Sequence, residues 1–170
     1  PGPTPCPDDV LEAIGRQMIN HRGPEFRDMI LRVTDNLKKV FRTENDVLTL
    51  TGSGTGGMEA AIANVLSPGD GVLSVSVGVF GDRFAQIAEA YGATVVRLTA
   101  EWGSAIAPDA VRDALKENPG VKAVLITHNE TSTGVTNDLP AISKVVREAG
   151  KLLIVDAISS LSSLPFYADE

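Results

Sequence analysis

A glycine-rich hexapeptide, Gly52-Ser53-Gly54-Thr55-Gly56-Gly57, has the composition of an anion-binding turn. It lies between a strand-like run at 46–51 and a helix-like run at 58–66. Glycines let a ligand approach the backbone closely, and the first N–H groups of a helix have no partner inside the helix. With the hydroxyls of Ser53 and Thr55 and the positive end of the helix dipole, these groups predict a phosphate site.

Three further loops follow apolar, strand-like runs and carry side chains that could bind a ligand. Phe80 could stack on a planar ring, although its residue type alone favours a core phenylalanine at a helix start. The run 127–134, which contains His128 and Ser132, is almost entirely polar, a composition that ordinary loops share. Asp156 ends a buried-looking strand, where a carboxylate needs a cation or hydrogen-bond donors, and the backbone of its own loop could supply the latter.

The four loops together match one ligand better than any of them does alone. A phosphate, a flat aromatic ring and a protonated ring nitrogen would satisfy them all, and pyridoxal 5′-phosphate (PLP) has these parts. A carboxylate such as that of Asp156 keeps the ring nitrogen protonated, because an adjacent negative charge favours the charged form. The protonated ring can then accept electrons from a substrate carbon.

Strand-like and helix-like runs alternate along most of the chain. This alternation predicts a three-layer α/β/α fold with a mostly parallel sheet, in which ligands bind at the carboxyl ends of the strands. The expected strands are 46–51, 71–77, 93–98, 121–127 and 151–155, and the expected helices are 8–20, 24–41, 57–66, 80–91, 108–117 and 138–149.

The composition argues against several classes of protein. With 170 residues, 43% of them hydrophobic, the chain has the profile of an ordinary globular protein. A net charge of −7 without a Lys/Arg cluster argues against nucleic-acid binding. The single Cys6 and the spacing of His21 and His128 argue against a disulfide framework or a metal site. No run is long and apolar enough to cross a membrane, and the first residues of the sequence lack the basic-then-apolar pattern of a signal peptide, so we expect a cytoplasmic protein.

The spacing Gly52-x-Gly54-x-x-Gly57 also fits the fingerprint of a dinucleotide-binding dehydrogenase. That interpretation needs an acidic residue at the end of the next strand, where this chain has Val77-Gly78-Val79. A P-loop would need a lysine that is absent from the turn. A dehydrogenase is therefore the weakest of the alternatives.

Several segments, taken together, resemble the class V aminotransferases, in the alanine–glyoxylate and serine–pyruvate branch of the fold-type-I PLP enzymes. The resemblance covers the whole chain, in order. It is carried by Thr51–Ala61, His21–Phe26, Thr127–Val135, Val155–Leu161 and the opening Pro1-Gly2-Pro3-Thr4.

This resemblance implies a role for each candidate residue. The segment Ser53–Thr55 would hold the cofactor phosphate, and Phe80 would take the place of an aromatic residue, often Trp, over the pyridine ring. Ser132 would contact the polar side of the cofactor, and Asp156 the ring nitrogen. The segment Pro1–Thr4 would run close to the substrate beside the partner subunit, because family members form homodimers.

The resemblance also implies that part of the machinery lies outside this chain. The lysine that forms the Schiff base in the family, and that also moves protons, follows the Asp156 equivalent at a distance beyond Glu170. The arginine that binds the substrate carboxylate is also expected beyond that point. We therefore expect residues 1–45 to be an arm with helices, residues 46–170 to be the N-terminal part of the PLP-binding large domain, and this chain to be inactive alone. None of its lysines matches the motif: Lys38, Lys39, Lys116, Lys122, Lys144 and Lys151.

Three functions follow from these expectations. The first is a PLP-dependent aminotransferase that moves an amino group from alanine or serine to a 2-oxo acid such as glyoxylate or pyruvate. A cysteine desulfurase-like PLP lyase is an alternative, but such enzymes usually have His where this chain has Phe80. The third is a non-catalytic binding or interaction module, whose open sheet edge would need a partner chain or a second copy.

Overall fold

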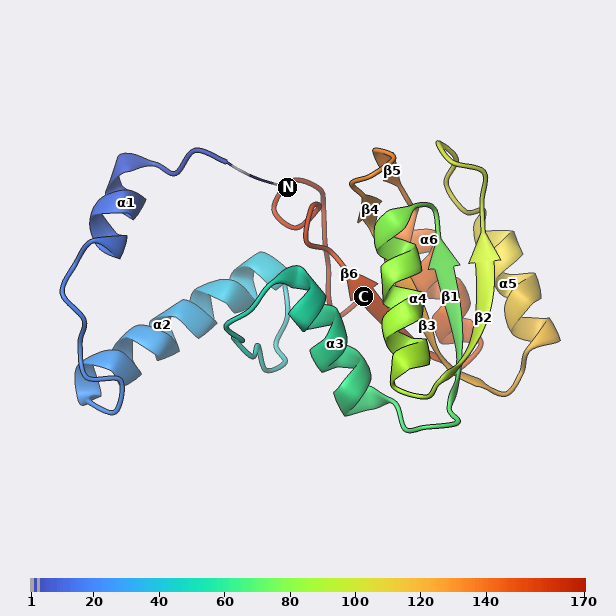
Figure 1. Cartoon of the computed structure of the whole chain (residues 1–170), viewed down its shortest axis with the longest axis horizontal. Coiled ribbons are helices and arrows are strands. Elements are labelled where there is room, and N and C mark those ends of the chain that lie inside the picture. Colours follow the sequence, from blue (N-terminus) through green and yellow to red (C-terminus); the bar gives the residue numbers. More distant parts are fainter. Residues whose placement is uncertain (1, 3) are drawn as a thin grey trace. The chain divides into compact units, whose positions relative to one another are not determined.

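The computed structural model describes residue 2 and residues 4–170, and the chain divides into two compact units (Figure 1). One unit comprises Pro1–Thr49 with Pro165–Asp169, and the other comprises Leu50–Leu164 with Glu170. The expected substrate contact of Pro1–Thr4 falls on Pro1 and Pro3, which lie outside the described residues.

The first unit contains two helices, α1 (Asp8–Ile14) and α2 (Pro24–Phe41). Helix α2 has the predicted bounds, because Pro24 suits a first helical turn and Arg42 ends the helix in the left-handed conformation, with φ of 51°. Helix α1 stops at Gly15 instead of continuing to the expected residue 20. The expected length was therefore wrong: the segment after Gly15 lacks helical hydrogen bonds.

The second unit is built on a four-stranded, fully parallel sheet in the order β2-β1-β3-β6. A two-stranded antiparallel hairpin stands apart from it. The strands of the sheet are β1 (Gly71–Ser76), β2 (Thr94–Thr99), β3 (Val121–Thr127) and β6 (Leu152–Asp156), and those of the hairpin are β4 (Asn129–Glu130) and β5 (Val135–Thr136).

Helices cover both faces of this sheet (Figure 1). Alternate residues of β1 and β3 point to opposite sides, so Val72 and Leu125 belong to one core cluster and Leu73 and Val124 to the other. Helices α3 (Gly54–Val65) and α4 (Val79–Ala90) contribute to the first cluster, and α5 (Pro108–Glu117) and α6 (Leu139–Glu148) to the second. The predicted three-layer α/β/α fold is confirmed.

The predicted strand at 46–51 is wrong. This run forms no strand, and Leu48 and Leu50 are 84% and 65% exposed. A strand needs a hydrogen-bonded neighbour, and within the described residues no strand pairs with this run. Strand β6 was expected to be buried on both faces, yet Leu152 is exposed, because β6 pairs only with β3 in the described sheet.

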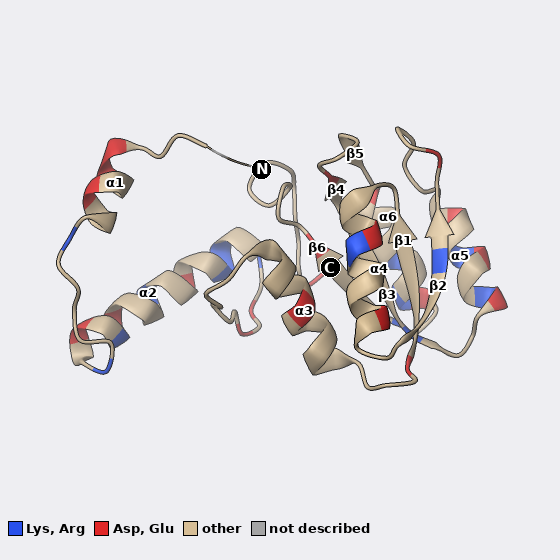
Figure 2. Cartoon of the chain, viewed as in Figure 1, with Lys and Arg blue, Asp and Glu red and all other residues tan. Residues whose placement is uncertain are grey.

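Helix α5 carries charged residues of both signs (Figure 2). Lys116 pairs with Asp113, and Arg112 with Asp109, in both cases three residues apart on the helix. Exposed pairs of this kind contribute little to stability. In the part of the chain that the structure describes, no helix combines the length and the apolar character that crossing a membrane requires.

Candidate cofactor site

The carboxyl ends of β1, β3 and β6 lie at one edge of the sheet, because the three strands are parallel neighbours. Helix α4 starts directly after β1, the hairpin follows β3, and the loop 157–164 follows β6. The residues that the sequence singled out in these loops therefore gather at this edge, as expected for a ligand site in a parallel sheet.

The glycine-rich turn forms the N-terminus of α3, which begins at Gly54, three residues before the expected start. Ser53 caps the helix: its hydroxyl oxygen accepts the backbone N–H of Gly56 at 3.3 Å. Within the described residues, the N–H groups of Gly54 and Thr55 have no acceptor. Two backbone donors and the positive end of the helix dipole thus remain available for an anion.

Arg83, on α4, places a positive charge beside this turn. Its Nη1 donates to Thr55 Oγ1 at 3.2 Å, and its guanidinium lies 5.1 Å from the ring centroid of Phe80. Arg83 was not among the predicted site residues, although its spacing of three residues from Phe80 on a helix places the two side chains on one face. Arg83 thereby connects the helix that carries the aromatic ring to the glycine-rich turn.

Asp156 is nearly buried, at 8% exposed, at the carboxyl end of β6. Its Oδ1 accepts the N–H of Ile158 at 3.0 Å, and Thr127 Oγ1 lies 3.5 Å from its Oδ2. Burial raises the pKa of the Asp156 carboxyl, the two hydrogen bonds oppose that rise, and the charge of Glu130 adds to it. No Lys or Arg among the described residues pairs with Asp156, so a ligand that brings a positive charge would be stabilised there.

A cavity of about 260 Å³ joins the glycine-rich turn to Asp156. The side chain of Ile158, which is 65% exposed, lies directly over Gly54 and occupies the space of a Cβ atom there. The sequence analysis missed Ile158, because an isolated apolar residue in a loop gives no signal of its own. The residues around the cavity are Gly54, Gly57, Met58, Ala61, Phe84, Ile154, Val155, Asp156, Ala157 and Ile158.

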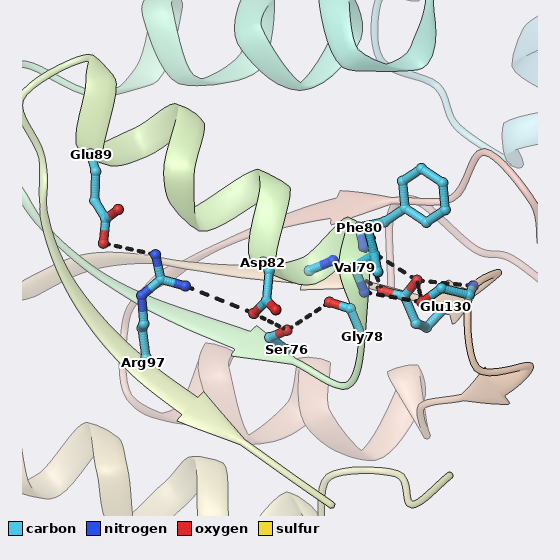
Figure 3. A network of polar contacts seen from close by, with 10 residues as sticks. Ser76, Gly78, Val79, Phe80, Asp82, Glu89, Arg97 and Glu130 are labelled. Atoms are coloured by element: carbon cyan, nitrogen blue, oxygen red, sulfur yellow. Dashed lines mark hydrogen bonds and ion pairs between the residues drawn. The ribbon is translucent and has the colours of Figure 1, made fainter. Parts of the chain in front are cut away.

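Ser132 and Phe80 are joined by the buried carboxylate of Glu130. Figure 3 shows this carboxylate beside Phe80, at the start of α4. Glu130 Oε2 accepts the N–H of Phe80 at 3.1 Å, and Oε1 accepts the hydroxyl of Ser132 at 2.7 Å. The Ser132 hydroxyl oxygen also accepts the N–H of Val79 at 3.0 Å. The sequence analysis expected Ser132 to face a ligand and missed Glu130, whose partners on α4 are about 50 residues away in the chain.

His128 lies in the protein interior, at the carboxyl end of β3. It is buried, and its backbone N–H donates to the carbonyl oxygen of Asp156 at 2.8 Å, which continues the pairing of β3 with β6. Burial lowers the pKa of the His128 imidazole, so the neutral ring is favoured. Among the described residues no group of three or more His, Cys, Asp or Glu side chains could hold a metal ion.

The family model for Aminotransferase class-V matches residues 1–170. The chain belongs to the class V aminotransferases. PLP is the cofactor of this family, and the open α3 N-terminus and the buried, cation-free carboxylate of Asp156 fit its phosphate and its ring nitrogen.

Individual proteins related to this class V aminotransferase chain carry different names. It is 49% identical to the soluble hydrogenase 42 kDa subunit of Anabaena cylindrica, over 96% of this chain and 43% of that protein. It is 41% identical to the serine–glyoxylate aminotransferase of Methylorubrum extorquens, over 100% of this chain and 44% of that protein. The alanine–glyoxylate aminotransferase of Nostoc sp. superposes with a TM-score of 0.94, at 35% identity, over 99% of this chain and 45% of that one. The chain thus spans less than half the length of these relatives.

Two lysines of this class V aminotransferase chain lie at the opposite edge of the sheet from Asp156. Lys122 donates to Asp70 and to the carbonyl oxygen of Val65, and Lys151 donates to the carbonyl oxygen of Pro119, all near the amino ends of strands. No lysine is among the described residues that surround the cavity.

Proposed function

We propose that the protein is a PLP-dependent aminotransferase that transfers an amino group from a small amino acid, alanine or serine, to a 2-oxo acid such as glyoxylate or pyruvate. One observation carries the proposal: a single cavity is bordered by the open N-terminus of α3 at Gly54 and by the buried carboxylate of Asp156. These two groups match the negative and the positive end of PLP.

Each residue of the site would have a defined task toward this cofactor. The N–H groups of Gly54 and Thr55, with the Ser53 hydroxyl beside them, would hold the phosphate, and Arg83 would supply the positive charge that a dianion favours. Asp156 would hold a proton on the ring nitrogen. When bound, PLP stabilises the electron pair that remains on a substrate carbon after its proton leaves.

Phe80 and Ser132 would define the surroundings of the ring. Phe80 stands at the first turn of α4 and offers an aromatic face that would exclude water from one side of the ring. Ser132, held beside it, would contact a polar substituent of the ring. These two roles and those of Ser53, Gly54, Thr55 and Asp156 are parts of the proposal.

The substrate class follows the names of the relatives. The relatives from Methylorubrum extorquens and Arabidopsis thaliana are named serine–glyoxylate aminotransferases, and the one from Paracoccus denitrificans is named an L-aspartate–glyoxylate aminotransferase. Glyoxylate is common to all three names, so a small 2-oxo acid is the better-supported half of the reaction. The hydrogenase name of the Anabaena cylindrica relative is not adopted, because the groups at the site match PLP.

Three further features belong to the same proposal. The protein would act as a homodimer in the cytoplasm. Residues 1–45 would form an arm with helices, and residues 46–170 would form part of the cofactor-binding domain.

Titration of the full-length protein with PLP tests the proposal. We expect a visible absorption band of bound PLP that changes when alanine or serine is added, and formation of glycine from glyoxylate. Asp156→Ala should weaken PLP binding by about tenfold or more, since a charge-assisted contact is lost. The exposed carboxylate of Asp113 offers a matched control, Asp113→Ala.

Two results would contradict the proposal. One is a wild-type protein that binds no PLP, and the other is an Asp156→Ala protein that binds it as tightly as the wild type. Release of sulfide from cysteine in place of amino transfer would favour the desulfurase-like lyase.

A further inference from the structure

Glu130 is a carboxylate with no exposed surface, at 0%. No Lys or Arg in the described part of the chain forms an ion pair with it. A buried charge of this kind is costly unless hydrogen bonds satisfy it. Five hydrogen-bond contacts do so, and all come from three residues: Phe80, Gly81 and Ser132.

These contacts join two segments that lie about 50 residues apart in the chain. Glu130 Oε2 accepts the N–H groups of Phe80 and Gly81, at 3.1 and 3.0 Å, in the first turn of α4. Oε1 accepts the backbone N–H of Ser132 at 3.1 Å and its hydroxyl at 2.7 Å. The carboxylate of Glu130 therefore fixes two groups at this edge of the sheet, the backbone at Phe80 and the hydroxyl of Ser132.

The neighbouring chain leaves room for this carboxylate. A Cβ atom on Gly78 would lie 2.6 Å from Glu130 Cγ and 2.5 Å from Ser132 Oγ. Only glycine at position 78 therefore lets Glu130 and Ser132 come so close to the start of α4. The arrangement therefore depends on Gly78 as well as on Glu130.

The same contacts fix the hydrogen-bonding character of Ser132. Its hydroxyl proton is donated to Glu130, and one of its two lone pairs accepts the N–H of Val79. A serine hydroxyl has one proton and two lone pairs, so toward a third group Ser132 can act only as an acceptor.

We propose that Glu130 is a positioning residue of the cofactor site, which holds Phe80 against the PLP ring and presents Ser132 to a ring substituent as a hydrogen-bond acceptor. This inference rests on the proposed function, because it assumes that PLP binds at this edge. It adds a residue that contacts the cofactor only through two others.

A purely structural role, as a cap for α4, is the competing explanation. Asp82 lies in the same first turn, accepts the hydroxyl of Ser76 at 2.8 Å and lies 3.8 Å from Arg97 (Figure 3). Among the described residues, the Asp82 carboxylate forms no hydrogen bond with Phe80 or Ser132. Asp82→Asn is therefore the matched control: it removes a negative charge from the same helix turn without touching either cofactor contact. If Glu130 only caps α4, Glu130→Gln and Asp82→Asn should change PLP affinity to a similar extent. If Glu130 positions Phe80 and Ser132, only Glu130→Gln should weaken PLP binding.

The test compares Glu130→Gln, Ser132→Ala, the double variant and Asp82→Asn by PLP titration. A glutamine side chain cannot accept from α4 and from Ser132 with both of its terminal atoms, and its NH₂ group would donate to Ser132 and release the serine proton. We expect Glu130→Gln to bind PLP about tenfold more weakly and the double variant to bind no worse than Glu130→Gln. The absorption maximum of bound PLP should also shift in Glu130→Gln. The PLP affinity and the absorption maximum of Asp82→Asn should both equal those of the wild type.

A ligand-free measurement separates this inference from the proposed function. Hydrogen–deuterium exchange of the Phe80 and Gly81 amides should be faster in Glu130→Gln than in the wild type without any PLP. Wild-type protein that binds PLP, together with a Glu130→Gln protein of unchanged affinity and spectrum, overturns the positioning role alone. Multiplicative effects of Glu130→Gln and Ser132→Ala also overturn it. Wild-type protein that binds no PLP overturns the proposed function instead.

A second variant keeps the test decisive if Glu130→Gln does not fold. Gly78→Ala keeps the carboxylate but pushes Glu130 and Ser132 away from α4. It should weaken PLP binding and shift the absorption maximum in the same direction. Unchanged affinity in a folded Gly78→Ala protein would contradict the inference.

Discussion

The side chain of Ile158 lies over the Cα atom of Gly54, so that a Cβ atom on residue 54 would overlap Ile158 Cδ1. The contact brings the loop that follows β6 onto the N-terminus of α3, although about 100 residues separate the two in the chain. It also closes one side of the cavity that reaches Asp156. The absence of a side chain at Gly54 thus lets this loop approach the glycine-rich turn closely.

Gly54→Ala should impair cofactor binding more than stability. Because Ile158 is largely exposed, its side chain can rotate away from the new methyl group, so we expect a change of less than about 1 kcal/mol in the free energy of unfolding by urea. The methyl group and the displaced side chain would enter the cavity and weaken PLP binding by about tenfold. Gly56→Ala, whose Cβ would meet only Ser53 Oγ at 4.0 Å, is the control. Equal PLP affinity of the Gly54→Ala and wild-type proteins would refute this prediction.

Arg83→Ala should weaken the binding of PLP more than that of pyridoxal, which lacks the phosphate. The guanidinium of Arg83 contacts Thr55 beside the anion-binding turn, so its loss should cost about tenfold in the dissociation constant for PLP. Arg97→Ala serves as the control, because Arg97 pairs with Glu89 and Asp82 and not with Thr55. Equal losses for PLP and pyridoxal would show that Arg83 supports only the fold.

Phe80→Leu should weaken PLP binding while Phe80→Trp should preserve it, since a flat ring is required for stacking and leucine is merely apolar. Stacking of two aromatic groups contributes about 1 kcal/mol beyond buried area, which corresponds to about fivefold in affinity. Quenching of the introduced tryptophan by PLP would add a direct sign of contact. Leucine and phenylalanine proteins of equal affinity would place Phe80 in the core alone.

The stability of the ligand-free protein should depend on pH through Asp156. Because burial raises the pKa of this carboxyl above its ordinary value of 3.8, the folded state binds the proton more tightly than the unfolded state. The contribution of Asp156 to stability therefore falls as the pH rises from 3.8 through the raised pKa, and it stays unfavourable above that. Urea unfolding of Asp156→Asn should show a gain over the wild type that grows across this interval and then becomes constant.

Asp70 provides a control of opposite sign. The hydrogen bond from Lys122 makes the largest contribution to lowering the pKa of the Asp70 carboxyl. The hydrogen bond from the N–H of Ser67 lowers this pKa further. Its favourable contribution is present above 3.8 and is lost as the pH falls through the lowered pKa. Asp70→Asn should therefore be less stable than the wild type at neutral pH, and a gain in that variant would contradict the assignment.

The elements from residue 71 onward could be predicted from the sequence. Apolar runs of strand length there alternate with helical patterns, and Pro68-Gly69, Pro119-Gly120 and Gly150 mark the breaks. The same alternation predicted a strand at 46–51, where it was wrong. A local pattern cannot reveal whether a run has a hydrogen-bonding neighbour, and this one has none in the described residues.

The parts of the site that could be predicted are those with a local signature. The glycine-rich turn and Asp156 at the end of a strand are visible in short stretches of sequence. Arg83, Glu130 and Ile158 acquire their roles only through contacts between distant segments, such as that between Glu130 and Phe80. A glutamate within a run of threonine and serine was the one signal available in the sequence, and the expected polarity of such a run concealed it.

The pairing of β3 with β6 sets Asp156 directly beside Thr127. Side chains alternate along a strand, so an offset of a single residue between these two strands would turn Asp156 toward the other layer of helices. A mispaired molecule would thus lose its carboxylate from the cofactor edge altogether and bury a charge among aliphatic side chains. Correct alignment of this pair of strands is therefore a condition for placing the carboxylate where the coenzyme would need it.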